Sequence, residues 1–237
     1  MKIHSFVTEI LIFSIISLFF VIPPLFVDVQ SVQHIDFTLF SVPNFSHFVI
    51  AVFIFIFYKN KLENHNTLTK KVLNYFIYFT IVFILLFGIA SIFNYIAQKL
   101  IQSDNNYSYS EVFIEIPKGF FAFFLCILNL FAAAFFEEII YRFYIPFGIK
   151  NFLFGKVFNE NQNKSYKILK KCILIFIEIV VMLIFSFSHR YLGIFSVMNA
   201  AVAHIVLRFS FVNSKSLIPS TLAHFAYNFI ALLLGIA

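Results

Sequence analysis

Long runs of apolar residues alternate with short polar segments along the whole chain. A helix needs about 20 mostly apolar residues to cross the hydrocarbon core of a bilayer. Runs of roughly that length lie at residues 5–27, 42–58, 72–97, 119–145, 172–189, 192–211 and 217–236. The pattern therefore predicts an all-α fold, a polytopic transmembrane helical bundle with about seven spans, seven or eight in number.

The first apolar run has the position of a secretory signal peptide but lacks the flanking sequences that are typical of one. Lys2 alone forms the positively charged region, and "VIPPLF" follows the run where a small-residue cleavage site would stand. These features favour a transmembrane span. No internal repeat or Gly/Ser-rich linker divides the sequence, so we expect a single integral membrane domain over residues 1–237.

The composition supports a membrane protein over a soluble one. The chain is 61% hydrophobic and 12% charged, whereas soluble domains are about 45–50% apolar and about 25% charged. Cys126 and Cys172 lie in or beside apolar runs, so no disulfide framework is predicted. A phenylalanine-rich chain with short loops and no tryptophan favours a bacterial plasma membrane.

The basic residues predict the orientation in the membrane. Loops 59–71 and 150–171 are rich in lysine, whereas loop 28–41 has acidic residues and no lysine or arginine, and loop 98–118 is slightly acidic. By the positive-inside rule, the two lysine-rich loops and the N-terminus are cytoplasmic. The net charge of +6 is therefore a topology signal. No nucleic-acid partner is expected, because the lysines occupy short loops at helix ends.

The fourth apolar run contains three charges within the stretch "AAAFFEEIIYRFYIP". Glu138 and Arg142 are four residues apart, so they share a helix face and can pair. Glu137 lies about 100° around the helix from Glu138. It is left without an obvious local partner and is a candidate general base. The alternative is a structural ion pair with a glutamate near the membrane interface.

Three histidines also lie in or beside the later apolar runs. His189 ends the fifth run, and His224 and Asn228 share one face of the last run. Together His224 and Asn228 can present hydrogen-bond donors to one point, as an oxyanion site requires. His204 has no polar neighbour one turn away except Arg208. We therefore expect a structural role for His204, or pairing with carbonyl groups.

Three motifs occur in order and in separate predicted spans: "EEIIYR" at 137–142, "FSFSH" at 185–189 and "HFAYN" at 224–228. This set resembles the CPBP family of intramembrane proteases, the CAAX prenyl endopeptidase and bacteriocin-processing (Abi) family. The resemblance covers about 120–235, the expected catalytic region. Residues 1–110 carry no family signal.

The resemblance implies an intramembrane endopeptidase that hydrolyses a peptide bond in an apolar or lipidated peptide. It assigns Glu137 to activating the attacking water and His189 to positioning that water or the carbonyl. His224 and Asn228 would stabilise the oxyanion, while Glu138 and Arg142 would fix the helix. The implied partners are the lipid bilayer and a peptide or protein substrate, either prenylated or of the bacteriocin or pheromone type.

The need for a metal cofactor stays open at this point. Glu137, His189 and His224 are residue types that bind zinc. The chain lacks the H-E-x-x-H motif that would make a zinc site specific. If Glu137 were a metal ligand, no other residue of the set would be left to act as the general base. A glutamate-type protease is therefore favoured over a metalloprotease, with a divalent metal such as zinc as the alternative.

Two other functions fit polar residues inside spans. A small proton- or ion-coupled transporter would show internal repeats and paired broken helices, and neither is visible. A non-catalytic scaffold or immunity factor would tolerate loss of a motif residue, and none is lost.

The depths of two candidate site residues conflict with these boundaries. Glu137 lies toward the cytoplasmic side of the fourth span, and His189 at the outer end of the fifth. Either the fourth span extends beyond residue 145, or residues 172–178 are interfacial, which Glu178 favours because a charge at depth is costly.

Overall fold

The fold is taken from a computed structural model of the chain. The described residues are 2–27, 34–62, 68–103, 113–154 and 164–234. Their α-helices are α1 Lys2–Ile16, α2 Val42–Leu62, α3 Leu68–Ser103, α4 Phe120–Glu137, α5 Ile145–Phe152, α6 Lys164–Phe187, α7 Ile194–Ser214 and α8 Ile218–Leu234. Shorter elements are η1 Ser17–Val21, η2 Pro23–Phe26, η4 Glu138–Tyr144, η6 Arg190–Leu192, β1 His34–Ile35 and β2 Phe113–Ile114.

Each predicted apolar run forms one helical segment, because α4, η4 and α5 follow one another without a break. The prediction of a helical bundle with about seven segments is confirmed. Four stretches of the described chain are long and apolar enough to cross a membrane: Thr8–Phe26, Lys71–Leu100, Phe120–Phe152 and Ile194–Ser214. Shorter apolar helices cover Val42–Tyr58 and Ile218–Leu234. The protein is an integral membrane protein.

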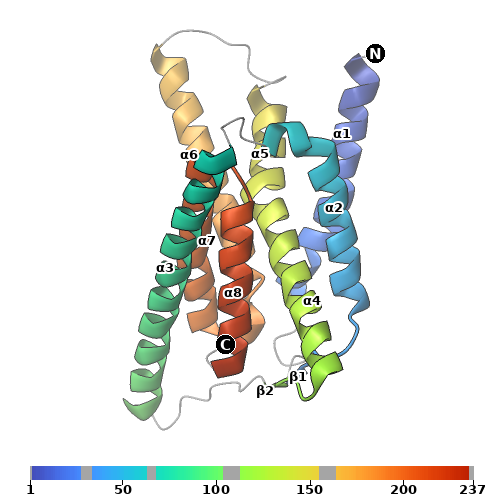
Figure 1. The fold of residues 1–237 in the computed structure, drawn as a ribbon. Coiled ribbons are helices and arrows are strands. Elements are labelled where there is room, and N and C mark those ends of the chain that lie inside the picture. The colour runs from blue at the N-terminus through green and yellow to red at the C-terminus, as the bar shows by residue number, and fades with distance from the viewer. Residues whose placement is uncertain (1, 28–33, 63–67, 104–112, 155–163, 235–237) are drawn as a thin grey trace.

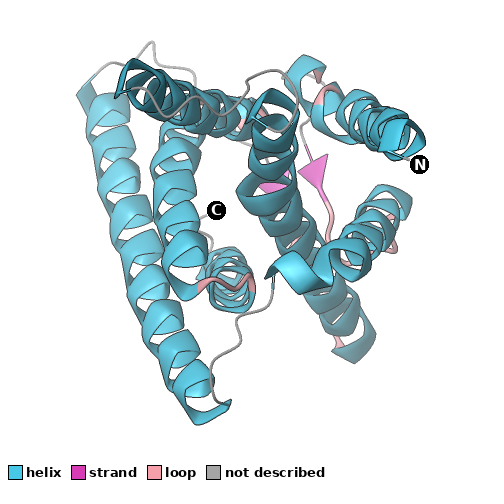
Figure 2. Ribbon diagram, turned by 90° about the horizontal axis from the view of Figure 1, so that it is seen from above, coloured by secondary structure: helices cyan, strands magenta, loops and turns pink. Residues whose placement is uncertain are grey.

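The helices pack in pairs around α4, α7 and α8 (Figures 1 and 2). The long helix α3 contacts both α7 and α8, while α4 lies between α2 and α8. Many large apolar side chains remain exposed, including Phe19, Phe57, Phe76 and Phe120. Exposed aromatic and aliphatic side chains are stable when hydrocarbon replaces water around the bundle.

A small parallel sheet closes one end of the bundle. Its strands β1 and β2 come from loops far apart in the sequence, and the Glu115 amide donates to the Ile35 carbonyl at 3.1 Å. The buried Asn129 of α4 donates its side-chain amide to the carbonyls of Phe37 and Leu39, both at 2.8 Å. These bonds fix the segment after β1 against α4.

The arrangement of helix ends agrees with the predicted alternation of loops. In Figure 1 the start of α1, the end of α2, the start of α3, the end of α5 and the start of α6 lie at one end of the bundle. The two strands and the end of α8 lie at the other. Parts of the four loops used for the orientation, 28–33, 63–67, 104–112 and 155–163, lie outside the described residues. Which end faces the cytoplasm stays a prediction.

Candidate active site

The fourth helix continues well past its predicted end and carries the two glutamates near its middle. It runs from Phe120 to Phe152, with a π-helical stretch over Glu138–Tyr144. Glu137 therefore lies about 26 Å along the helix from Phe120, at a rise of 1.5 Å per residue. The fourth helix thus extends beyond residue 145, as the first alternative requires. The depth of Glu178 within α6 stays a prediction.

Glu138 and Arg142 form the predicted ion pair, and both side chains are fully buried. Arg142 Nη2 lies 3.4 Å from Glu138 Oε1. The same oxygen lies 3.0 Å from Nδ1 of His224. Because an ionised carboxylate only accepts hydrogen bonds, His224 Nδ1 carries the hydrogen. The sequence predicted the first partner of Glu138 but not the second.

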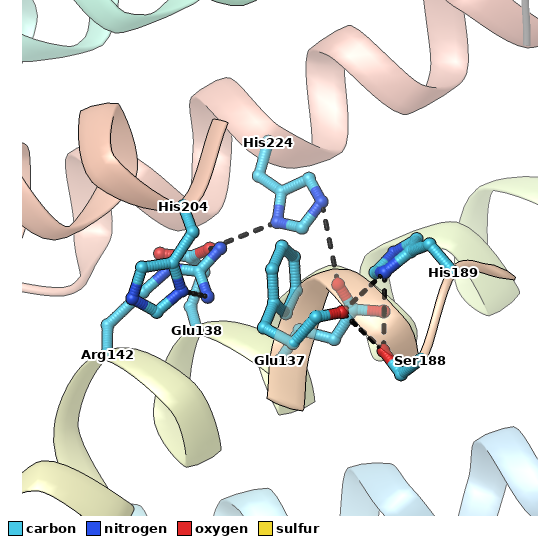
Figure 3. Close-up of polar contacts among 8 residues, drawn as sticks. Glu137, Glu138, Arg142, Ser188, His189, His204 and His224 are labelled. Atoms are coloured by element: carbon cyan, nitrogen blue, oxygen red, sulfur yellow. Dashed lines mark hydrogen bonds and ion pairs between the residues drawn. The ribbon is translucent and has the colours of Figure 1, made fainter. Parts of the chain in front are cut away.

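Glu137 faces a different environment from its neighbour. Its side chain is 23% exposed, and Oε2 lies 3.7 Å from His224 Nε2. That oxygen has no hydrogen-bond partner among the described residues. Glu137 was expected to lack an obvious local partner, and the polar group beside it, His224, comes from the distant helix α8. Figure 3 shows His224 between Glu137 on one side and Glu138 on the other.

The second motif fixes the orientation of His189. The residue follows the end of α6, and its Nδ1 lies 2.9 Å from the backbone carbonyl of Phe185. A carbonyl accepts, so Nδ1 carries the hydrogen and Nε2 is left with its lone pair. The ring also packs against the Phe185 ring, with centroids 4.7 Å apart. The spacing of four residues thus orients one imidazole.

Glu137, His189, His224 and Asn228 all line one cavity of about 630 Å³. The predicted convergence of these side chains is therefore present in the structure, while their catalytic roles stay a prediction. The cavity is also lined by polar residues that the motifs did not indicate: His47, Asn94, Asn199 and Tyr227. They come from α2, α3, α7 and α8, and only their position inside predicted spans could have drawn attention to them.

His204 does not line this cavity but contacts Arg142 of the buried ion pair. Arg142 Nη1 donates to His204 Nδ1 at 2.9 Å. A guanidinium only donates, so the His204 hydrogen is on Nε2. The Arg142 guanidinium also lies 4.1 Å over the Phe185 ring. The partner of His204 is therefore an arginine rather than a carbonyl group, in a buried, structural setting.

A second ion pair supports the π-helical stretch. Pro146 has no N–H, so it cannot donate to the carbonyl of Arg142 four residues earlier. Arg208 donates to that carbonyl at 2.5 Å. Arg208 also binds both carboxylate oxygens of Glu178, with Nε at 2.8 Å from Oε2. This pair explains how Glu178 is accommodated within α6.

The metal prediction can be compared with the arrangement of the donors. His189 Nδ1 is hydrogen-bonded to a carbonyl and His224 Nδ1 to Glu138. Within the described part of the chain, no three side chains of His, Cys, Asp or Glu are grouped as metal ligands would be. Metal dependence stays open to measurement.

The fold and the cavity define the class of protein. It is an integral membrane protein that carries paired glutamates, two histidines and an asparagine inside its helical bundle. Residues 119–230 match the family model described as Type II CAAX prenyl endopeptidase Rce1-like. All three motifs fall within the match. This match agrees with the resemblance to CPBP proteases over the same part of the chain. Comparisons with curated proteins and with solved structures found no match.

Proposed function

We propose that the protein hydrolyses a peptide bond inside the membrane, with Glu137 as the general base. The family match supports a CAAX-type intramembrane protease. The observation that carries the mechanism is the contrast between two adjacent carboxylates. Glu138 is fully buried beside Arg142, whereas Glu137 is partly exposed to the cavity. Only Glu137 can therefore meet a water molecule and a substrate.

The first half of the reaction needs a base and an orienting group. A water molecule beside Glu137 loses a proton to the carboxylate as its oxygen attacks the scissile carbonyl carbon. His189 Nε2, which is free of protein hydrogen bonds in the described chain, accepts the second hydrogen of that water and orients it. General-base assistance of this kind contributes about 10²–10⁴ in rate.

The second requirement is stabilisation of the oxyanion by His224 and Asn228. Since His224 Nδ1 donates to Glu138, the ring can donate to the oxyanion only from Nε2, as an imidazolium. Glu138 and Glu137 lie beside its two ring nitrogens, at 3.0 and 3.7 Å. Glu138 therefore orients His224 as well as pairing with Arg142. The Asn228 amide supplies the second donor, and one such donor is worth about 10²–10³ in turnover.

The substrate in this proposal is an apolar or lipidated peptide that enters from the bilayer. The family description names a CAAX prenyl endopeptidase, so a C-terminal prenylated peptide is the first candidate. A bacterial substrate of the bacteriocin or pheromone type is the second. The cavity suits either, because Phe20, Phe37 and Phe93 line it together with the polar groups. We further propose a bacterial plasma membrane as the location, with the N-terminus cytoplasmic.

A quantitative proteomic comparison of membranes tests this function whatever the substrate is. Cells would express wild type, Glu137→Gln or Glu115→Gln at matched levels. Glu115 is a carboxylate outside the cavity and serves as the control. We expect at least one peptide or protein to accumulate uncleaved only with Glu137→Gln. Identical cleavage products in all three membranes would contradict the proposed function.

A further inference from the structure

His47 is an imidazole that lines the same cavity but belongs to no motif. It comes from α2, outside the region matched by the family model. Its ring stacks on Phe136, with centroids 4.3 Å apart and planes at 23°. Phe20 meets the ring edge-on, with centroids 5.4 Å apart. Two aromatic residues therefore hold this imidazole in one orientation.

The ring nitrogens of His47 differ from those of the other cavity histidines. His189 and His224 each use Nδ1 in a hydrogen bond that fixes the ring. His47 has no hydrogen bond or ion pair with any described residue, and its side chain is only partly buried. Both of its nitrogens are therefore available to water or to a bound substrate.

This imidazole lines the same cavity as the proposed general base. Phe136 directly precedes Glu137, and both His47 and Glu137 line the cavity. A water molecule in the shared cavity can therefore connect the two groups and carry a proton between them.

The proposed hydrolysis also requires that the proton taken up by Glu137 reaches the leaving group. An amine leaves a tetrahedral intermediate readily only after it has gained a proton. His224 donates to the oxyanion, and His189 Nδ1 donates to Phe185. We propose that His47 is the general acid that protonates the leaving amine. This assignment rests on the proposed function of Glu137.

The proton balance closes over one turnover. Glu137 takes a proton from water as the carbon–oxygen bond forms. Glu137 passes this proton to neutral His47. The imidazolium formed gives it to the amide nitrogen as the carbon–nitrogen bond breaks, which releases a carboxyl product and an amine and restores both groups. No oxidant, reductant or further reactant is needed.

The test compares an amide substrate with its ester. The probes are a quenched fluorescent peptide ending in farnesyl-Cys-Val-Ile-Ala and its analogue with an ester after the cysteine. An alkoxide leaves with much less need for a proton than an amine does. His47→Phe keeps the aromatic stack and removes both nitrogens. We expect it to lower kcat on the amide by about 10²-fold or more and on the ester by less than about threefold.

Two further variants separate proton transfer from a structural role. His47→Ala opens a space of ring size on Phe136, so added imidazole should restore amide cleavage there but not in His47→Phe. His34 lies outside the cavity lining, and His34→Phe should leave both rates unchanged. Glu137→Gln should lose activity on both the amide and the ester substrate.

Three outcomes would overturn the assignment. Equal losses on amide and ester with His47→Phe would mean that His47 only shapes the site. Unchanged amide turnover would mean that it has no part in the reaction. If wild type cleaves neither probe, the proposed function fails on this substrate class, and the assignment of His47 falls with it.

Discussion

Two adjacent glutamates differ here because a helix turns by about 100° between neighbouring residues. Glu138 points into a closed cluster with Arg142, and Glu137 points into the cavity. A buried charge that loses its partner typically costs about 3–5 kcal/mol, whereas an apolar replacement of the whole pair can be neutral. The stability of this site therefore depends on the ion pair of Glu138 with Arg142, whereas its proposed chemistry depends on the carboxylate of Glu137.

Arg142→Ala should lower the folded yield as well as activity. The change leaves Glu138 buried with His224 as its remaining close partner and removes the donor to His204. Replacing Glu138 by Gln and Arg142 by Met together should recover the yield better than the activity, because His224 loses its carboxylate. Size-exclusion profiles and thermal unfolding would measure the yield. Wild-type yield and activity in Arg142→Ala would refute the pairing argument.

Asn228→Ala should fold normally and lose turnover. Asn228 lines the cavity and makes no hydrogen bond that supports the described fold. Loss of one oxyanion donor lowers turnover by about 10²–10³, with little change in thermal stability. His204→Gln is the matched comparison, because it sits behind the ion pair and outside the cavity. It should lower stability more than turnover. The reverse pattern in the two variants would contradict the assigned roles.

At the scale of the helix, the π-helical stretch depends on Pro146 and on Arg208. Arg208 supplies the donor that Pro146 cannot give to the Arg142 carbonyl. Arg208→Ala should therefore destabilise the protein, by leaving this carbonyl and Glu178 without their partner. Pro146→Ala returns an N–H to the helix, so the two changes should be non-additive in a double-mutant cycle of thermal stability. Additive effects would show that the two residues act independently.

The helices themselves could be predicted from the sequence because hydrophobic runs of membrane length are a strong signal. The ion pair within one turn was predictable for the same local reason. Three features were not. His224 between two carboxylates, Arg208 beside Glu178 and His47 in the cavity of Glu137 all depend on how helices far apart in the sequence pack together. The extension of the fourth helix to Phe152 was only one of two alternatives at the sequence level, because lysine and proline usually mark the end of a helix.

At the scale of the whole molecule, the lysine-rich loops predict which end of the bundle is cytoplasmic. Single cysteines at Asn151 and Ile116 would be labelled in a background with Cys126 and Cys172 replaced by serine. Both positions are exposed, and the first adjoins a lysine-rich loop. We expect an impermeant maleimide to label Ile116→Cys in intact cells, and Asn151→Cys only after permeabilisation. Labelling of Asn151→Cys from outside would reverse the orientation.

The central claim is that Glu137 activates the water that cleaves the peptide bond. The most direct measurement is cleavage of the farnesylated peptide by purified protein in proteoliposomes prepared in ¹⁸O-labelled water. The account predicts one ¹⁸O atom in the new carboxyl terminus. It also predicts a rate at least about 10²-fold lower for Glu137→Gln, which should fold as well as wild type, and a wild-type rate for Glu115→Gln. Cleavage by Glu137→Gln at the wild-type rate, with the same ¹⁸O content, would contradict the account.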